Sequence, residues 1–418
     1  MTSWLALAAG PALAQQQPAA DPMAGTMFDR STNVSVTDRA RPEYDALGIP
    51  AGAFLIFPKV VLSGDYDDNI LAQASGGPTD YVFDVNPTLT VRSNWNRHSL
   101  SISGMVDQSF YADHTTENTT QWTVRGDGRL DVLRDMTVSF SGGGGLLTEP
   151  RTESYDVQTK TPIQYNSDFA SVKVVKGFNR FKFTAGYNYN YFGYHDNETF
   201  GGAPVVESYR NNNEQTFTGR GDYALSPATA LFVEGDYLRY NYSNQLAGYP
   251  RNSDGGQVLS GLNFQLTHVL TGEVGFGYFT ESFSDPAFHN VNEPSYRVSL
   301  QWYPTQLLTV TFTGNQTTYD SGVQNSPTYL ARLGQVQGDW ELRRNIIITA
   351  RGGYANWQYQ GIDRTDERYL GYLAATYLVS STVGVNLHYS VTHQTSVGTL
   401  AGPHFTDNVV GVALTLQR

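Results

Sequence analysis

Apolar and polar residues alternate one by one along most of this chain. In the stretch from Tyr296 to Trp302 every second residue is apolar, and the residues between them are arginine, serine and glutamine. A period of two is typical of a β-strand with one apolar and one polar face. After a break at 303–306 the alternation restarts near Leu308, so the unit is an antiparallel hairpin with a tight turn.

The hairpin recurs from Phe54 to the end of the chain, and the pattern predicts about eighteen strands, with sixteen as the alternative. Short connections such as 133–136 and 303–306 alternate with long polar ones such as 148–164 and 243–255. A transmembrane antiparallel up-and-down β-barrel has this arrangement, with short periplasmic turns and long extracellular loops. A soluble sandwich or propeller gives no reason for connections to be sorted by length in this way. We therefore predict an all-β fold of the outer-membrane type.

The hydropathy of the chain is compatible with this fold. Its mean hydropathy is negative, which would ordinarily indicate a soluble protein. No segment approaches the run of about 18 apolar residues that a membrane helix needs. In a barrel with a polar interior only half of each strand faces lipid, so a low mean hydropathy is expected there as well.

The first 48 residues are expected to lie outside the barrel. Residues 1–14 contain the apolar stretch and small residues of a secretory signal peptide, although the basic segment that usually precedes them is lacking. Residues 15–48 are rich in Pro, Ala, Asp and Thr and have little periodicity, which predicts a flexible periplasmic tail. The barrel then occupies residues 49–418.

The charge balance and the lack of cysteine narrow the class of protein. Asp and Glu number 39 against 27 Lys and Arg, which gives a formal net charge of -12. This acidic balance makes nucleic acid an unexpected partner. The lack of cysteine suits a protein that crosses an oxidising periplasm unfolded. The expected partners are outer-membrane lipid, lipopolysaccharide and the barrel-assembly machinery.

Charged residues indicate which strand face points inward. In the strand from Trp122 to Val132 all charged residues fall on one side and the large apolar ones on the other. A charge at the bilayer midplane costs about 2–4 kcal/mol, so the charged side faces the lumen. The rule places these residues inside: Arg92, Asp107, Arg125, Asp127, Arg129, Asp131, Arg220, Asp222, Glu234, Asp236, Glu273, Arg297, Asp339, Glu341 and Arg351. Such charges either line a pore or pair across the wall, and the sequence leaves both interpretations open.

One strand does not follow the rule without an irregularity. Asp236 and Arg239 are three positions apart, so a regular strand would place them on opposite faces. Keeping both residues inward requires a β-bulge near Tyr237.

The connection 148–164 is one of the longest, and its charged residues make it the candidate constriction loop. These residues are Glu149, Arg151, Glu153, Asp156 and Lys160. If the loop folds inward, it narrows the pore and selects what passes. If it lies over the top, it does neither, and both arrangements remain open.

Sequence evidence for bound metal or catalysis is sparse. Asp65, Asp67 and Asp68 cluster at the end of the first strand, and their oxygens could hold Ca²⁺ at the rim. The cluster lacks the glycine and distal glutamate of a calcium loop, so a solvated strand end is the preferred interpretation and no metal site is predicted. The chain contains no Gly-x-Ser-x-Gly, His-Glu-x-x-His or phosphate-loop motif. We expect neither a cofactor nor an enzyme.

The stretch from Arg41 to Pro58 contains Arg-Pro-x-Tyr-Asp and a Phe-x-x-x-Pro opening, and Tyr-Asp-Asp-Asn follows at 66–69. It resembles the entry segment of the putative beta-barrel porin 2 family of alphaproteobacterial outer-membrane proteins. Over the rest of the barrel the resemblance lies in general texture, so no pore residue is carried over. The resemblance implies a role in surface-polysaccharide secretion. Continuous export would favour a periplasmic polysaccharide-export component that binds the tail 15–48, whereas a diffusion porin needs no such partner.

The expected function is that of an integral channel of the Gram-negative outer membrane that passes a hydrophilic solute. Export of an exopolysaccharide or oligosaccharide is the leading hypothesis, because it combines a wide barrel with the family resemblance. One alternative is a general diffusion porin. The second is a structural or adhesive barrel whose lumen is plugged.

Overall fold

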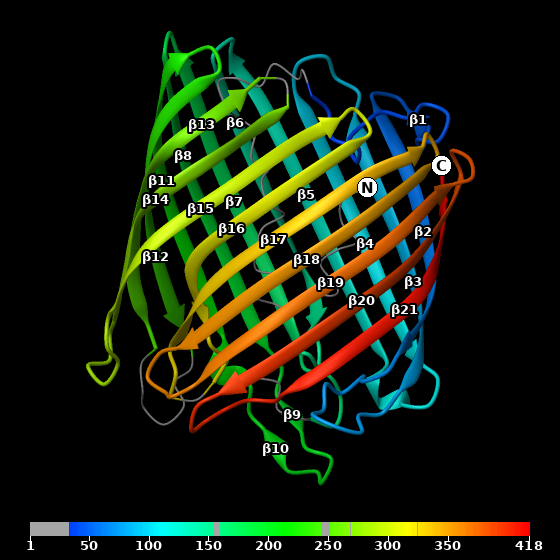
Figure 1. Ribbon diagram of the computed structural model, residues 1–418, viewed down its shortest axis with the longest axis vertical. Coiled ribbons are helices and arrows are strands. Elements are labelled where there is room, and N and C mark those ends of the chain that lie inside the picture. Colours follow the sequence, from blue (N-terminus) through cyan, green and yellow to red (C-terminus); the bar gives the residue numbers. More distant parts are fainter. Residues whose placement is uncertain (1–32, 154–158, 244–250, 268, 324) are drawn as a thin grey trace.

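The structure is a computed structural model that describes residues 33–153, 159–243, 251–267, 269–323 and 325–418. Eighteen antiparallel strands, strongly tilted, close into one barrel (Figure 1). Each strand pairs with the strands that precede and follow it, and the last pairs with the first. The predicted fold class and the predicted strand number are confirmed.

The barrel strands are β2 (Phe54–Asp67), β3 (Asp80–Ser93), β4 (Ser99–Tyr111), β5 (Thr119–Leu133), β6 (Met136–Thr148), β7 (Gln164–Phe178), β8 (Phe181–Tyr194), β11 (Asn212–Ser226), β12 (Thr229–Tyr242), β13 (Ser253–Leu266), β14 (Leu270–Phe283), β15 (Val291–Thr305), β16 (Leu308–Asp320), β17 (Thr328–Arg343), β18 (Ile346–Tyr359), β19 (Thr365–Leu378), β20 (Val383–Val397) and β21 (Phe405–Gln417).

Closure of the ring depends on β2, which is paired along both edges. One edge pairs with β3 over its whole length, and the other pairs with β21 from Lys59 to Asp67. The short strand β1 (Ile49–Ala51) pairs with Phe54–Ile56, beyond the point where β21 ends. An even number of strands returns the C-terminus to the end of the barrel at which β1 lies (Figure 1).

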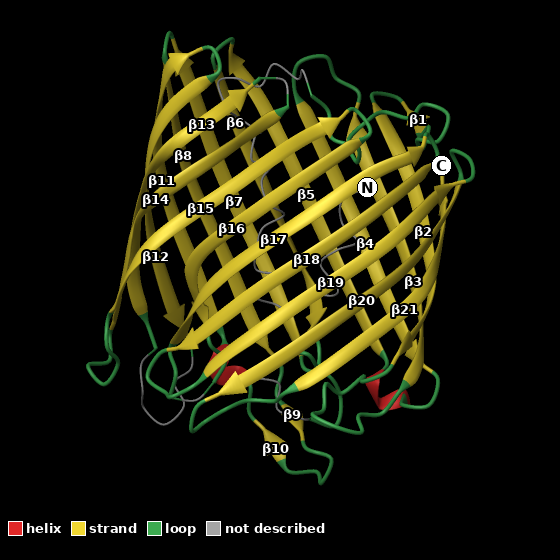
Figure 2. Ribbon diagram, viewed as in Figure 1, coloured by secondary structure: helices red, strands yellow, loops and turns green. Residues whose placement is uncertain are grey.

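Connections at the two ends of the barrel differ in length. At one end, which we call the short-turn end, turns of two to five residues join the strands. The opposite, long-loop end carries the hairpin of β9 (Asn197–Glu198) and β10 (Pro204–Val205). It also carries the two 3-10 turns η1 (Thr115–Glu117) and η2 (Ser208–Arg210), drawn red in Figure 2. The sorting expected from the sequence is therefore present.

The two faces of the wall differ as the alternation predicts. Phe83, Leu130 and Val233 are exposed on the outer face, while charged neighbours such as Arg129 and Glu234 project inward. In the described part of the chain, no helix is long and apolar enough to cross a bilayer.

The predicted bulge near Tyr237 is wrong. Strand β12 pairs with β11 and β13 without a register shift at this position. Asp236 faces the lumen, whereas Arg239 lies on the outer face, with its Nε 3.4 Å from Oδ1 of Asp254. Arg239 is near the long-loop end, where a charge on the outer face is close to water and costs little.

Candidate functional site

The lumen contains a network of charges on one side, centred on Arg220 of β11. The guanidinium of Arg220 lies 2.8 Å from Asp222, 3.1 Å from Glu234 and 2.7 Å from Glu273. Arg297 of β15 reaches Glu234 at 2.8 Å and Glu273 at 3.3 Å. Because β11, β12, β14 and β15 all contribute, this network ties one side of the wall together.

The charges of β5 make smaller, local contacts. Arg125 binds Asp127 through two nitrogens, at 2.6–3.0 Å, and Arg129 lies 2.8 Å from Asp131. Both pairs join residues two apart on one strand, so they do not connect strands. The structure thus separates the predicted lumen charges into a buried network and a water-exposed set.

The remaining predicted residues lie elsewhere around the lumen. Arg92 lies over the ring of Phe57, and Asp107 is buried near the β3–β4 pairing. Asp339 accepts hydrogen bonds from Gln337 and Thr349, each at 2.8 Å. Arg351 donates to Gln337 at 3.1 Å, Asp236 accepts from Thr218 at 2.7 Å, and Glu341 contacts residues of the N-terminal segment.

The first part of the candidate constriction loop, residues 149–153, folds inward and is held by buried ion pairs. Glu149 accepts two hydrogen bonds from Arg210, at 2.6 and 3.1 Å, and Arg210 also binds Glu207 at 3.0 Å. Arg151 binds Glu117 through two nitrogens, at 2.9 and 3.1 Å. These residues lie in three different connections at the long-loop end, and all are buried.

The same loop reaches the opposite wall of the barrel. Arg368 of β19 donates to the carbonyl oxygen of Thr152, and its Nη1 lies 3.9 Å from Glu153. In the ring of strands, β19 lies across from β6 and β7, which flank the loop (Figure 1). Residues 149–153 therefore reach across the lumen. Lys160 is instead exposed and pairs with Glu198 of β9 at 2.6 Å, and Asp156 lies outside the described residues.

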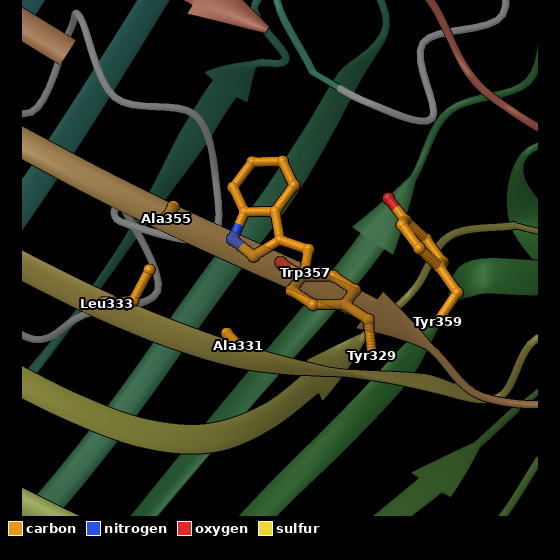
Figure 3. Close-up of a cluster of buried hydrophobic side chains, with 6 residues drawn as sticks. All are labelled: Tyr329, Ala331, Leu333, Ala355, Trp357 and Tyr359. Carbon is orange, nitrogen blue, oxygen red and sulfur yellow. The ribbon is translucent and has the colours of Figure 1, made fainter. Parts of the chain in front are cut away.

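Where the loop meets the opposite wall, the lumen surface is aromatic. Tyr329, Trp357 and Tyr359 project from β17 and β18 and pack together, at ring-centroid distances of 5.4–5.5 Å from Tyr329 (Figure 3). The guanidinium of Arg368 lies 4.5 Å from the Trp357 ring centroid, and that of Arg364 lies 4.5 Å from Tyr359. Arg368 is held by stacking on the ring, by two hydrogen bonds to Gln394 of β20 at 2.7 and 3.1 Å, and by its hydrogen bond to the loop.

The sequence had not singled out Arg210, Arg368 or Glu117. The alternation on β19 would have placed Arg368 inward, on the face opposite the exposed Tyr369 and Leu373. No local pattern shows that its partners lie in a loop more than 200 residues earlier in the chain.

Two carboxyl groups in the connection 195–211 have pKa values that differ from their ordinary values. Burial raises the pKa of Glu207, although Arg210 opposes this shift. Hydrogen bonds from the backbone amides of Ser208 and Glu207 lower the pKa of Asp196. The charged form of Asp196 therefore holds the backbone of the segment that carries Arg210.

Residues 33–48 lie against the inner wall at the short-turn end. Arg39 and Arg41 both bind Oε2 of Glu341, at 2.9 and 3.0 Å, and the amide of Val36 donates to Thr309 at 3.0 Å. The side chain of Val36 is buried beside Ile347 and Leu378. Part of the segment expected to be a flexible tail thus packs on the barrel. Residues 15–32 and the expected signal peptide 1–14 lie outside the described residues.

The weak metal candidate is only partly assembled. Asp67 and Asp68 lie with Asp407 of β21, with ligand atoms within 4.8 Å of one another. Asp65 lies apart from them and pairs with His388 at 3.2 Å. Asp68 already accepts hydrogen bonds from the amide and side chain of Asn408, at 2.7 and 2.8 Å. The hydrogen bonds between Asp68 and Asn408 therefore help to fasten the end of β2 to β21.

A family model described as "Putative beta-barrel porin 2" matches residues 41–418. The chain belongs to this family. Membership agrees with the resemblance in the entry segment and identifies a porin-like β-barrel of the outer-membrane type. No curated protein matches the sequence.

Several solved structures are similar to the chain. A mutant of the ferric enterobactin receptor from Pseudomonas aeruginosa has 7% identity and a TM-score of 0.48, over 88% of this chain and 82% of that one. The siderophore receptor PirA from Acinetobacter baumannii has 7% identity and a TM-score of 0.45, over 86% and 80%. The outer membrane protein opdK from Pseudomonas aeruginosa has 11% identity and a TM-score of 0.43, over 87% and 99%.

Proposed function

We propose that the protein is a gated outer-membrane channel that passes a hydrophilic glycan, a polysaccharide or oligosaccharide exported to the cell surface. The observation that carries the proposal is the segment 149–153, which crosses the lumen and is held on the far wall by Arg368. A segment that crosses the lumen either narrows the pore or closes it, and in this proposal it closes the channel. Only a few buried contacts hold the segment on the far wall, so the channel can break them when it passes from a closed to an open state.

The glycan cargo is supported by the uncharged polar groups of the lumen. Sugar hydroxyls both donate and accept hydrogen bonds, and hydroxyl and amide side chains match them in both roles. Such side chains recur on the inner face of strands around the ring, at Ser139, Ser141, Ser171, Thr311, Thr313, Gln335, Gln337, Asn386 and Ser390. Membership of the porin family also supports a glycan cargo, because the resemblance of the entry segment to this family implies a role in surface-polysaccharide secretion.

The proposed partner is a periplasmic export component that binds the chain near its N-terminus. We place the short-turn end in the periplasm, as in other barrels of this type. Residues 33–48 lie at that end and are held mainly by Glu341, Thr309 and a small apolar contact. A partner that binds residues 15–48 would therefore act at the periplasmic entrance of the channel.

The experiment is single-channel recording in a planar bilayer, comparing the native protein with Arg368→Met. The substitution keeps the bulk of the side chain and removes the donors that hold Thr152. Arg332→Met is the matched control, because Arg332 lies on β17, two strands from β19, and binds Asn356 at 3.1 Å. Deletion of residues 150–162 provides a stronger release of the same loop.

We expect a closed native channel, a closed Arg332 control, and open channels after Arg368→Met or the deletion. Malto-oligosaccharides should then interrupt the open current for periods that lengthen with chain length. A large steady conductance in the native protein would instead indicate a general diffusion porin. A barrel that stays closed after the deletion would indicate a plugged structural or adhesive protein.

A further inference from the structure

The inner face of β5 to β7 near the short-turn end has a distinctive arrangement of small and cationic side chains. In the register of these strands, Arg129 of β5 lies opposite Ser139 of β6, and Ser139 lies opposite Lys173 of β7. The next inward row along β6 holds Ser141, whose hydroxyl lies 2.6 Å from that of Ser171. Two cations thus flank a strand whose inward side chains are small. We call Arg125, Arg129, Ser139, Ser141 and Lys173 the cationic strip.

Water reaches the cations of the strip. The Arg129 side chain is 58% exposed, whereas that of Arg220 in the buried network is 13% exposed. Lys173 is also exposed, and no acidic group of the described residues lies within ion-pair distance of it. Among the described residues, the acidic partner of Arg129 is Asp131, two positions away on the same strand. These cations are therefore available to a ligand without the loss of a buried network.

The strip has two distinct ends. At the short-turn end it meets a cavity of about 420 Å³ lined by Arg97, Arg129, Asp131, Leu133, Arg134 and Thr137. Towards the middle of the barrel it ends at Phe169, whose ring lies under the guanidinium of Arg125 at 5.1 Å. Gly143 is required there, because a Cβ at this position would clash with the backbone oxygen of Val124 and would lie 2.9 Å from the Phe169 ring.

We propose that the cationic strip and its cavity bind an acidic glycan, one that carries carboxylate groups along its chain. This inference rests on the proposed function and names the class of its cargo. Arg129 and Arg134 are suited to carboxylates because a guanidinium can donate two parallel hydrogen bonds to one carboxylate. The serine hydroxyls between the cations match the sugar hydroxyls.

The spacing also fits a chain rather than a single small anion. Arg125 and Arg129 are four residues apart on β5, which corresponds to about 13 Å along the strand. The cavity at Arg97 and Arg134 extends the cationic surface beyond Arg129 to the end of the barrel. Successive acidic groups of one ligand can therefore contact Lys173, Arg129 and the arginines of the cavity, while Arg125 stays paired with Asp127.

The test measures binding of a galacturonic acid pentamer to the detergent-solubilised full chain by titration calorimetry, with maltopentaose as the neutral probe of equal length. We expect the acidic pentamer to bind and maltopentaose not to displace it. Added salt should weaken the binding, since the strip is exposed and salt screens exposed charges. Lys173→Gln together with Arg129→Gln should weaken it about 10-fold or more, as the loss of two charge contacts implies.

Arg239→Gln is the matched control, because Arg239 is an exposed cation on the outer face near the opposite end of the barrel, where it pairs with Asp254. It should leave the affinity unchanged. Lys173→Arg keeps the charge and should retain binding, which separates lost charge from a misfolded barrel. Equal binding of the two pentamers, or an unchanged affinity in the double variant, would overturn the inference.

Failure of the acidic-glycan inference can be distinguished from failure of the gated-channel proposal. The strip lies on the short-turn side of the loop, so binding does not require the loop to open. A channel that opens on release of the loop but shows no preference for the acidic pentamer would contradict this inference alone. A barrel that binds the acidic pentamer but stays closed after deletion of 150–162 would contradict the channel and leave an acidic-glycan receptor.

Discussion

Arg220 and Arg129 are both arginines on the inner face of a barrel strand, yet their surroundings differ. Arg220 contacts three carboxylates on three strands and is mostly shielded from water. Arg129 contacts one carboxylate on its own strand and is largely exposed. The buried network, centred on Arg220 and Arg297, holds the wall together. The cationic strip leaves its charges available. The comparison shows that lumen charges of the same type can serve structure or ligand binding, according to their partners.

The largest expected effect is that of removing the centre of the buried network. Arg220→Met leaves Asp222, Glu234 and Glu273 with too few cations, so the free energy of unfolding should fall by about 3–5 kcal/mol. The measurement is urea unfolding of the protein in lipid vesicles. Arg129→Met is the control and should cost less than about 1 kcal/mol, because its ion pair is exposed. Similar losses in the two variants would remove the distinction between the two regions.

The second expected effect concerns the loop that crosses the lumen. Glu149→Gln removes a buried charge that Arg210 binds with two nitrogens. The closed position of the loop should be destabilised by about 3 kcal/mol. This value is at the low end of the range for a broken buried ion pair, because Glu207 still binds Arg210. Limited proteolysis should then cut within 149–163 roughly 100-fold faster. The control Glu198→Gln breaks only the exposed pair with Lys160, and an equal acceleration there would contradict the account.

A third, smaller effect is expected at the short-turn end. Glu341→Gln weakens the hydrogen bonds that fasten Arg39 and Arg41, and charged hydrogen bonds contribute about 1.5–3 kcal/mol each. Hydrogen exchange over residues 33–48 should become faster while exchange in the strands stays the same. Glu367→Gln, on the outer face of β19, is the control. Unchanged exchange over 33–48 in the Glu341 variant would show that other contacts hold the segment.

The smallest effect is expected for Glu207→Gln. Burial raises the pKa of Glu207, so its charged form destabilises the native state relative to the unfolded chain. This cost is present above the raised native pKa and disappears as the pH falls below the unfolded pKa. The native protein should therefore gain stability on mild acidification, relative to a Gln variant that has no such dependence. Thermal midpoints of both proteins at pH 7 and pH 4 measure this, and parallel changes would contradict it.

The faces of the strands could be predicted from the sequence. A period of two and the high cost of a charge in lipid are both local, so they placed Arg129 and Glu234 correctly on the inner face. Arg239 was assigned wrongly because the rule takes no account of depth. Near the end of a strand the outer face meets water, and an outward arginine there costs little.

The loop and the N-terminal segment could not be derived in the same way. Whether 149–163 folds inward depends on Arg368 and Arg210, whose positions relative to the loop follow from closure of the whole ring. Residues 33–48 have no periodicity, and their contacts with Thr309 and Glu341 join parts of the chain that are far apart in sequence. The exposure that separates Arg129 from Arg220 likewise depends on neighbours that only the folded barrel brings together.

The central claim is that the loop crosses the lumen and is held by Arg368. The most direct test is a pulsed electron spin measurement of one distance, with labels on Thr152→Cys and Tyr369→Cys. The native chain has no cysteine, and Tyr369 is exposed on the outer face beside Arg368. The account predicts one short, narrow distance distribution, which becomes longer and broader when Arg368→Met is added. A long, broad distribution in the unmodified background would mean that the loop lies over the top, and would contradict the gate.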